Sequence, residues 1–452
     1  MFVQVDMIMS ERKMIYLCLA HMSEAGMEQK YVKEAFDTNW VVPMGPNVNA
    51  FEGDLEKFVN NRDFSTQPSA SLEMTEKNAE VMADWNDRKV VCLSAGTAAV
   101  HLALIACGVK AGDEVLVQSF TFCASSHPIT YLGAKPVFID SERDTWNMDP
   151  ELLEKAIIER KEATGKYPKA IIPVALYGMP YDCEKIMAIA DKYGIPVIED
   201  AAEGMGSRFD GQVLGTFGRF GVLSFNGNKM ITTSGGGALI CRSSEDANEI
   251  MWYATQARDA YPYYEHTAIG YNYRMSNVCA GIGRGQMTVL DDHIAHHKHV
   301  QQLYRELLAD VEGVTLHDQP EDARYDSNFW LCAATLDPSV MIVGQENAYK
   351  EVIKSAVGGA AGVIKAVDSA VTDCQPNDNV EALRVFMLDK KVECRPVWKP
   401  MHKQPVYADA VSYVNGVSEE IFKVGFCLPA GPYVTDEDVK YIVECIKEAI
   451  VK

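Results

Sequence analysis

The stretch KVVCLSAGTAAVHLALIAC, residues 89–107, contains in one run the pattern on which the fold prediction rests. Its first five residues are mainly apolar and predict a strand, because short apolar runs bounded by turn residues are typical of buried strands. The small residues at 94–97 then predict a turn. From Ala98 to Cys107 apolar residues recur at helical spacing, and Gly108 ends the pattern. A strand, a tight turn and a helix in this order indicate an α/β unit.

Further units of the same kind follow toward the C-terminus. The runs that predict strands are EVLVQS (114–119), KPVFID (135–140), AIIPVAL (170–176), PVIED (196–200), GVLSF (221–225) and GALIC (237–241). Amphipathic segments such as residues 183–194 lie between several of them, and this alternation predicts a mostly parallel sheet. Residues 246–312 are predicted to be mainly helical. From about residue 325 shorter strands and helices alternate up to a final helix at residues 436–450.

The composition is that of a folded protein, and its length allows about two or three domains. Acidic residues number 63 against 42 basic ones, and the net charge of −21 disfavours nucleic acid and anionic membrane surfaces as partners. The 12 cysteines include no C-x-x-C pair, which disfavours a metal site and favours a reducing compartment. The sequence contains neither a run of about 20 apolar residues nor a secretory signal pattern. We therefore expect a cytoplasmic protein.

Three groups of polar residues fall where strands are predicted to end. Residues 94–97 precede a helix, and a helix N-terminus is suited to binding a phosphate. Asp200 ends the run PVIED, and Lys229 lies in the loop SFNGNKMITTSGGG (224–237) between two predicted strands. Each feature alone has an ordinary explanation, as a tight turn, a helix cap or a solvated lysine. Together they match the needs of pyridoxal 5'-phosphate (PLP): an anion site, a carboxylate for its ring nitrogen and an amine for its aldehyde.

Ordered motifs along the chain resemble one family, the DegT/DnrJ/EryC1/StrS sugar aminotransferases. The resemblance covers the chain from about Tyr16 to the C-terminus. The motifs are NWVVPMGPNVNAFE (39–52), LSAGTAAVHLAL (93–104), SFTFCASSHPITYLGAKPVFID (119–140), IEDAAEGMGS (198–207), SFNGNKMITTSGGG (224–237), GYNYRMSN (270–277) and RPVWKPMH (395–402). Several ordered matches of this length make a chance similarity negligible.

The resemblance implies the type I fold of PLP-dependent transferases, an α/β fold. A large PLP-binding domain with a mostly parallel central sheet and helices on both faces is expected at residues 16–290. It would follow an N-terminal tail at residues 1–15 and precede a smaller α+β domain at residues 291–452. Members of the family form homodimers with active sites at the subunit interface, so the resemblance also implies a homodimer.

The same resemblance implies roles in binding PLP. Lys229 would be the catalytic residue, which attaches to the cofactor aldehyde and moves the proton between cofactor and substrate carbons. Asp200 would pair with the ring nitrogen, and Phe122 would stack on the ring. The residues expected around the phosphate are Gly96, Thr97, Ser224 and Asn272 of the partner subunit. Glu203 occupies a position near the cofactor where relatives differ, and a surface salt bridge is the alternative role for it.

A lysine at position 229 implies transamination, because relatives with histidine there perform a dehydration instead. The family mostly aminates nucleotide-linked ketosugars for cell-surface glycans, with L-glutamate as the amino donor. Residues 224–237 are most similar to those of members that aminate a 4-keto-6-deoxy sugar, as in the synthesis of UDP-N-acetylbacillosamine or perosamine. A PLP-dependent sugar dehydratase and a PLP-binding regulatory protein of the same fold are the alternatives.

A nucleotide diphosphate needs cationic contacts, which the acidic chain as a whole does not supply. The candidate substrate-binding residues are Asn39, Trp40, Arg395, Lys399 and His402. Surface charges and core aromatics explain these residues equally well. The histidines at 293, 296, 297 and 299 have spacings that could bind a metal, but a solvated helix face is the favoured interpretation. The stretch 60–88 is longer than is usual in the family, so the resemblance assigns no role to it.

Overall fold

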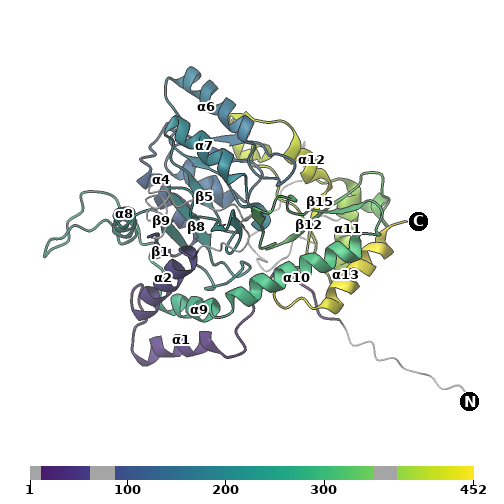
Figure 1. Ribbon diagram of the computed structural model, residues 1–452, viewed down its shortest axis with the longest axis horizontal. Coiled ribbons are helices and arrows are strands. Elements are labelled where there is room, and N and C mark those ends of the chain that lie inside the picture. Colours follow the sequence, from purple (N-terminus) through teal and green to yellow (C-terminus); the bar gives the residue numbers. More distant parts are fainter. Residues whose placement is uncertain (1–11, 62–86, 350–373, 452) are drawn as a thin grey trace, which may run out of the picture.

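A computed structural model describes residues 12–61, 87–349 and 374–451 of the protein (Figure 1). Its central feature is a twisted sheet built from two four-stranded parts. Parallel bridges from Ile171 to Val197 and from Val174 to Asp200 join the two parts. The strands, in their order across the sheet, are β1 (Lys89–Leu93), β9 (Gly237–Cys241), β8 (Phe220–Ser224), β5 (Ile198–Asp200), β4 (Ile171–Ile172), β2 (Glu114–Gln118), β3 (Lys135–Ile139) and β14 (Ser412–Tyr413).

Strand β9 is antiparallel to both of its neighbours, and the other described pairs of the central sheet are parallel. The predicted mostly parallel α/β sheet is therefore confirmed. Its parallel strands β2, β4, β5 and β8 end at the same edge, where ligands bind in open α/β sheets. This edge carries the turn after β5 and the loop between β8 and β9.

Helices cover both faces of the sheet, and alternate residues of each strand supply the two cores. In β1, Val90 and Cys92 belong to one core, and Val91 and Leu93 belong to the other. The helices of the first core are α2 (Pro46–Val59), α6 (Pro150–Thr164), α7 (Cys183–Tyr193) and α9 (Asn277–Met287). Those of the second are α4 (Gly96–Ala106), α5 (His127–Tyr131) and α8 (Ser244–Ala254). Helix α1 (Met27–Asp37) packs against α9.

A second, antiparallel sheet lies in the C-terminal part of the chain. Its strands are β10 (Val314–Leu316), β12 (Cys332–Leu336), β15 (Gly425–Leu428) and β13 (Arg395–Pro396), in that order. Helices α10 (Leu290–Leu308), α11 (Asp378–Asp389) and α13 (Asp436–Ala449) share a hydrophobic core with it, and α12 (Val417–Val424) contacts β12 and β15. Figure 1 shows α10 running from α9 to the region of α11 and α13.

Smaller elements complete the described chain. A three-stranded antiparallel sheet contains β11 (Tyr325–Asp326), β6 (Arg208–Phe209) and β7 (Gln212–Val213). Short 3-10 helices are η1 (Cys123–Ser125), η2 (Leu176–Gly178), η3 (Gln345–Asn347), η5 (Met401–Lys403) and η6 (Pro405–Tyr407). Strands β11 and β14 both pair with strands that precede residue 290. The domain boundaries at residues 15/16 and 290/291 stay predictions, although α10 begins at Leu290.

The histidine-rich stretch of α10 differs from its interpretation as a solvated helix face. His297 has 0% of its surface exposed and His293 has 6%, because this side of α10 packs against the rest of the chain. Their Nδ1 atoms lie 3.2 Å from the carbonyl oxygens of Phe329 and Met230, respectively. Burial lowers the pKa of His297 to about 3. The solvated-face interpretation was therefore wrong for these two residues.

The described ranges leave out most of the long stretch at 60–88, and also residues 1–11 and 350–373, so predictions for those segments lie outside them. Within residues 12–61, 87–349 and 374–451, none of the helices combines the length and the apolar character that crossing a bilayer requires.

Candidate active site

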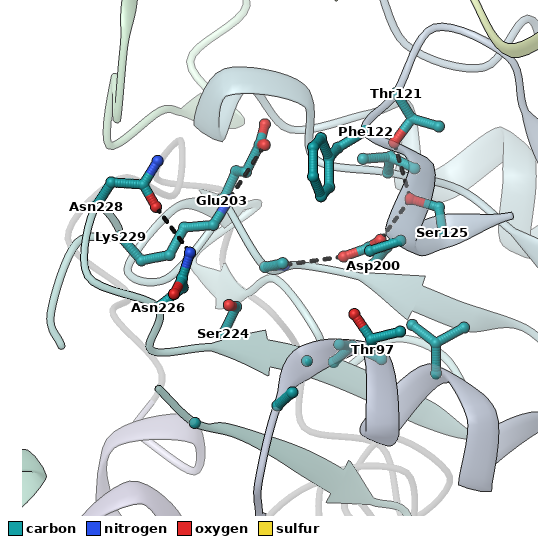
Figure 2. Close-up of a pocket in the computed structure, with 18 of the residues that line it drawn as sticks. Thr97, Thr121, Phe122, Ser125, Asp200, Glu203, Ser224, Asn226, Asn228 and Lys229 are labelled. Atoms are coloured by element: carbon teal, nitrogen blue, oxygen red, sulfur yellow. Dashed lines mark hydrogen bonds and ion pairs between the residues drawn. The ribbon is translucent and has the colours of Figure 1, made fainter. Parts of the chain in front are cut away.

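A cavity of about 310 Å³ lies at the sheet edge described above (Figure 2). The turn between β1 and α4, the end of β5 and the loop between β8 and β9 all contribute to its wall. The residues lining it are Ser94, Ala95, Gly96, Thr97, Val100, Thr121, Phe122, Ala124, Ser125, Val174, Asp200, Ala202, Glu203, Val222, Ser224, Asn226, Asn228, Lys229, Gly235, Gly236, Trp330 and Trp398. The three polar groups predicted at strand ends therefore meet in one cavity.

The first turn of α4 forms one wall of the cavity. Ala95 precedes the helix in an extended conformation and offers no side-chain cap, so the backbone N–H groups at the helix start are available to a ligand. A Cβ added to Gly96 would come within 3.2 Å of Cβ of Ser224, which explains the need for glycine at this close approach. The hydroxyls of Thr97 and Ser224 lie beside the helix start. This arrangement suits a phosphate dianion.

Asp200 ends β5 and lies at the opposite side of the cavity from the lysine loop, with 6% of its surface exposed. Its Oδ2 accepts a hydrogen bond of 2.6 Å from Oγ of Ser125, and its Oδ1 accepts one of 3.2 Å from the N–H of Ala202. Burial raises the pKa of the Asp200 carboxyl, whereas these hydrogen bonds and the charge of Lys229 lower it. These two hydrogen bonds fix the carboxylate in place, and it can accept a further hydrogen bond from a donor in the cavity.

Lys229 forms a buried ion pair with Glu203. Its Nζ lies 3.2 Å from Oε1 of Glu203, and the two side chains are 13% and 6% exposed. The other oxygen of Glu203 accepts a hydrogen bond of 2.8 Å from the N–H of Tyr177. Burial raises the pKa of Glu203, and the charge of Lys229 opposes that shift. The alternative of a surface salt bridge for Glu203 was therefore wrong, because the pair lies inside the cavity.

Aromatic rings form the remaining wall. Phe122 is 49% exposed, and its ring centroid lies 5.3 Å from that of Trp398. Nζ of Lys229 lies 4.0 Å from the ring centroid of Trp330. Neither Trp330 nor Trp398 was predicted as a site residue. Trp398 lies in the motif at residues 395–402, whereas Trp330 follows the lysine by about a hundred residues and lies in none of the motifs.

Five predicted substrate residues and one cofactor residue lie outside this cavity wall. Asn39 and Trp40 are exposed in the turn after α1, and Asn272 is exposed after the loop that follows α8. Arg395 is half-exposed and pairs with Glu393, with a shortest N–O distance of 2.6 Å. Their roles stay predictions.

The other two substrate candidates follow β13. His402 has a buried side chain, with Nδ1 2.6 Å from Oγ of Ser119 and Nε2 3.1 Å from Oε1 of Glu419. The carbonyl oxygen of Lys399 lies 3.4 Å from Nε2 of Gln404. His402 therefore links segments of the chain, and its contact with a substrate stays a prediction, as does that of Lys399.

The residues present in the cavity fit PLP. The N-terminus of α4, with Gly96 open to the cavity, suits its phosphate. Asp200 is a buried carboxylate of the kind that a protonated ring nitrogen needs, and Lys229 is an amine held at a defined place in the same cavity.

The sequence model of the DegT/DnrJ/EryC1/StrS aminotransferase family matches residues 72–359 and 363–447. The chain belongs to this family. The chain is 39% identical over 438 residues to EpsN of Bacillus subtilis, which is assigned as a pyridoxal phosphate-dependent aminotransferase; the match covers 96% of this chain and 95% of EpsN. It is 31% identical to GDP-perosamine synthase of Escherichia coli O157:H7, over 96% of this chain and 99% of that enzyme.

Solved structures agree with this family membership at the level of the fold. The PLP form of Spr1654 of Streptococcus pneumoniae, assigned as a sugar aminotransferase, superimposes with a TM-score of 0.75 at 21% identity. The match covers 96% of this chain and 98% of that one. This DegT/DnrJ/EryC1/StrS protein therefore has the type I fold and is a PLP-dependent aminotransferase, as predicted.

Proposed function

We propose that this aminotransferase moves the amino group of L-glutamate to the keto carbon of a nucleotide-linked sugar, with Lys229 as its catalytic residue. The observation that carries the proposal is the meeting of Lys229, Asp200 and the N-terminus of α4 in one cavity. PLP has an aldehyde, a ring nitrogen and a phosphate. The amine of Lys229, the carboxylate of Asp200 and the helix N-terminus are suited to these three groups, in that order.

PLP, when bound, supplies an electron sink that lets a proton leave the carbon bearing the amino group. Asp200 would accept the ring N–H and keep that nitrogen protonated, and Ser125 fixes the carboxylate for this task. Lys229 would hold the cofactor and then take a proton at Nζ from one substrate carbon and return it elsewhere. Phe122, at the mouth of the cavity, would cover the ring. The turn residues Gly96 and Thr97 would bind the phosphate together with Ser224.

The proposed amino transfer has two half-reactions. L-glutamate would leave its amino group on the enzyme and depart as 2-oxoglutarate, with water supplying the new keto oxygen. The ketosugar would then take that amino group and release its own oxygen as water, so that no water is consumed overall. A 4-keto-6-deoxy hexose is our proposed acceptor. The support is the similarity of residues 224–237 to members with such substrates, and the match to GDP-perosamine synthase across almost the whole chain. The product would serve a cell-surface glycan and would be made in the cytoplasm.

The nucleotide diphosphate needs a cation that the cavity wall of one chain does not offer, because Lys229 is the cationic side chain among the described lining residues. Arg395 and Lys399 are candidates for that contact, with Asn39, Trp40 and His402 as further ones. A second copy of the chain is our proposed source of the remaining contacts. In its support, Asn272 is exposed on its own chain and follows a loop with exposed Tyr264 and Ile269, which are 77% and 84% exposed.

The test is a panel of sugar nucleotides with L-glutamate labelled with ¹⁵N. We expect ¹⁵N in the sugar product for one or more 4-keto-6-deoxy sugars carried on GDP, UDP or TDP, and none with Lys229→Ala. A 3-keto sugar as the sole acceptor would contradict the proposed position of the keto group. Consumption of a ketosugar without glutamate, by loss of water alone, would indicate the dehydratase alternative, which Lys229 already disfavours.

A further inference from the structure

The side chain of Lys229 lies between two groups of different kinds. The carboxylate of Glu203 lies 3.2 Å from Nζ, and the face of the Trp330 indole lies 4.0 Å from it, measured to the ring centroid. An ammonium over an indole face is attracted by the negative potential of the ring, and this attraction strengthens where water is excluded. Trp330 has 1% of its surface exposed, so the contact is largely shielded from solvent.

Trp330 is also fixed relative to the lysine loop. Its indole N–H donates a hydrogen bond of 2.7 Å to the carbonyl oxygen of Asn228, the residue before Lys229. Its backbone N–H donates one of 2.8 Å to Oδ1 of Asn328. The ring can therefore move little without moving the loop that carries the lysine.

The same short segment also fixes the loop of Glu203. The side-chain amide of Asn328 donates hydrogen bonds of 2.9 Å to the carbonyl oxygens of Glu203 and Met205. Residues 328–330 thus bind the two loops whose side chains form the ion pair. Neither half of the ion pair is placed by its own loop alone.

We propose that Trp330 is a positioning residue for Lys229. Its ring face, together with Glu203, forms a resting site for the lysine side chain while Nζ carries a proton and is not bonded to the cofactor. Nζ would be released from the cofactor in the first half-reaction and would bond to it again only at the end of the second, and a fixed resting site would keep Nζ near the reacting carbon during that interval at low cost in side-chain entropy. This inference rests on the role that we propose for Lys229.

The alternative is that Trp330 only fills space behind the lysine. The two roles differ in what a substitution changes. A resting site depends on the aromatic face and favours the charged amine, whereas a space-filling role depends on bulk and is served by leucine as well as by phenylalanine.

The test uses the cofactor-free full-length chain and measures acetylation of Lys229 by acetic anhydride at one fixed pH, with peptide mass spectrometry. Only the neutral amine reacts, so loss of the aromatic face in Trp330→Leu should raise the rate on the order of fivefold. Trp330→Phe keeps a face and should stay within about twofold of the wild type. Trp398→Leu opens the same cavity without touching the ammonium, and should also stay within about twofold.

The proposal is overturned if Trp330→Leu reacts at the wild-type rate, if Trp330→Phe reacts as fast as Trp330→Leu, or if Trp398→Leu reacts equally fast. If Trp330→Leu does not fold, the wild type and Lys229→Met decide. The indole ¹H–¹⁵N resonance of Trp330, assigned by its loss in Trp330→Phe, should shift in Lys229→Met, and an unchanged resonance overturns the proposal. Borohydride fixation of PLP to Lys229 in the loaded wild type tests the role of Lys229 separately, so the two failures are distinguishable.

Discussion

Asp200 and Lys229 face the same cavity but meet different surroundings. The carboxylate of Asp200 is held by Ser125 and the N–H of Ala202, whereas the amine of Lys229 is held by a carboxylate and an indole face. Each group therefore keeps its place without the other.

Replacement of Asp200 tests its proposed contact with the ring nitrogen. Asp200→Asn keeps the size of the side chain but removes the charge that would hold a proton on that nitrogen. We expect the rate of the glutamate half-reaction, measured in single turnover, to fall by at least about a hundredfold.

Ser125→Ala is the matched control, because it leaves the charge of Asp200 in place and removes the hydroxyl whose hydrogen bond of 2.6 Å orients the carboxylate. The same substitution also removes the hydrogen bond of 2.8 Å between Ser125 and Thr121. We expect a loss of about tenfold for it. Equal losses in the two variants would mean that the charge of Asp200 is not what matters.

Whether a residue of the cavity could be predicted from the sequence depended on whether it lies in a local motif. Lys229, Asp200 and Gly96 lie in motifs with a fixed spacing to strand ends, and strand ends of a parallel sheet meet at one edge. Trp330 reaches the cavity only because residues 328–330 bind the loops of Glu203 and Lys229 through contacts made across the fold. Such long-range hydrogen bonds leave no local periodicity to detect.

At the level of elements, η2 contacts the ion pair of Lys229 and Glu203, because the N–H of Tyr177 in η2 donates a hydrogen bond to Glu203. Gly178 ends η2 with φ +92°, and a Cβ at this position would overlap with Oδ1 of Asn328. Gly165, at the end of α6, has φ +73° with open space around it. Comparing substitutions at the two glycines therefore distinguishes two contributions to the free energy of unfolding: the strain of a left-handed backbone, present at both, and a steric clash, present only at Gly178.

We expect Gly165→Ala to cost about 1 kcal/mol and Gly178→Ala about 3 kcal/mol, because only the second adds overpacking to the left-handed conformation. Thermal unfolding of both variants beside the wild type measures the difference. Equal shifts in the unfolding midpoint would show that Asn328 is not held tightly beside Gly178.

Helix α10 links protonation to stability through His297. This residue is neutral in the folded chain, since burial lowers its pKa to about 3, but it takes up a proton in the unfolded chain below about pH 6.5. Stability from this residue is therefore full above about pH 6.5 and is lost as the pH falls below it, by about 1.4 kcal/mol per pH unit.

His297→Gln should abolish this contribution, so its loss of stability between pH 7.5 and 5.0 should be about 2 kcal/mol smaller than that of the wild type. Urea unfolding at the two pH values measures it. His299→Gln is the matched control, because His299 is exposed on the same helix, and it should leave most of the pH dependence of stability in place. An unchanged pH dependence in His297→Gln would refute a neutral buried imidazole.

Elements were predicted with unequal success, and the reason is physical. The pattern of β1 and α4 is local and was found to within a residue or two. Strand β4 covers only two residues of the predicted run 170–176. Farther along the run, Val174 still bridges to Asp200 of β5, but it donates its N–H to the side chain of Gln118. The burial of His293 and His297 depends on what packs against α10, which periodicity does not reveal.

At the scale of the whole molecule, the proposed homodimer would supply what the cavity of one chain lacks. The loop before Asn272 carries Tyr261, Tyr263 and Tyr264, which are 49%, 57% and 77% exposed. Exposed aromatic and aliphatic groups in one loop are typical of an interaction surface. Asn272 would then reach the phosphate site of the partner.

Light scattering should give about twice the chain mass of 50.0 kDa. The double variant Tyr264→Glu and Ile269→Glu should shift the protein toward the monomer and weaken PLP retention. Met341→Glu, at another residue that is 57% exposed, is the matched control and should leave the mass unchanged. A monomeric wild type that retains PLP would contradict the proposed dimer.

For the whole molecule, the α/β fold could be predicted from the pattern of strands and helices in the sequence. The homodimer was predicted only from the resemblance to the aminotransferase family. A chain with −21 net charge says only which partners are disfavoured. The contacts that join β14 to β3 and β11 to β6 tie the C-terminal part of the chain to the large sheet, and no composition shift marks them.

The glutamate half-reaction in the absence of any sugar tests most directly whether this protein takes the amino group of L-glutamate through Lys229. The PLP-loaded protein is mixed with L-glutamate, and the 2-oxoglutarate released is measured in the wild type and in Lys229→Ala. We predict about one 2-oxoglutarate per chain in a single burst for the wild type, and none on the same timescale for the variant. Release of 2-oxoglutarate by Lys229→Ala at the wild-type rate, or its absence in the PLP-loaded wild type, would contradict the claim.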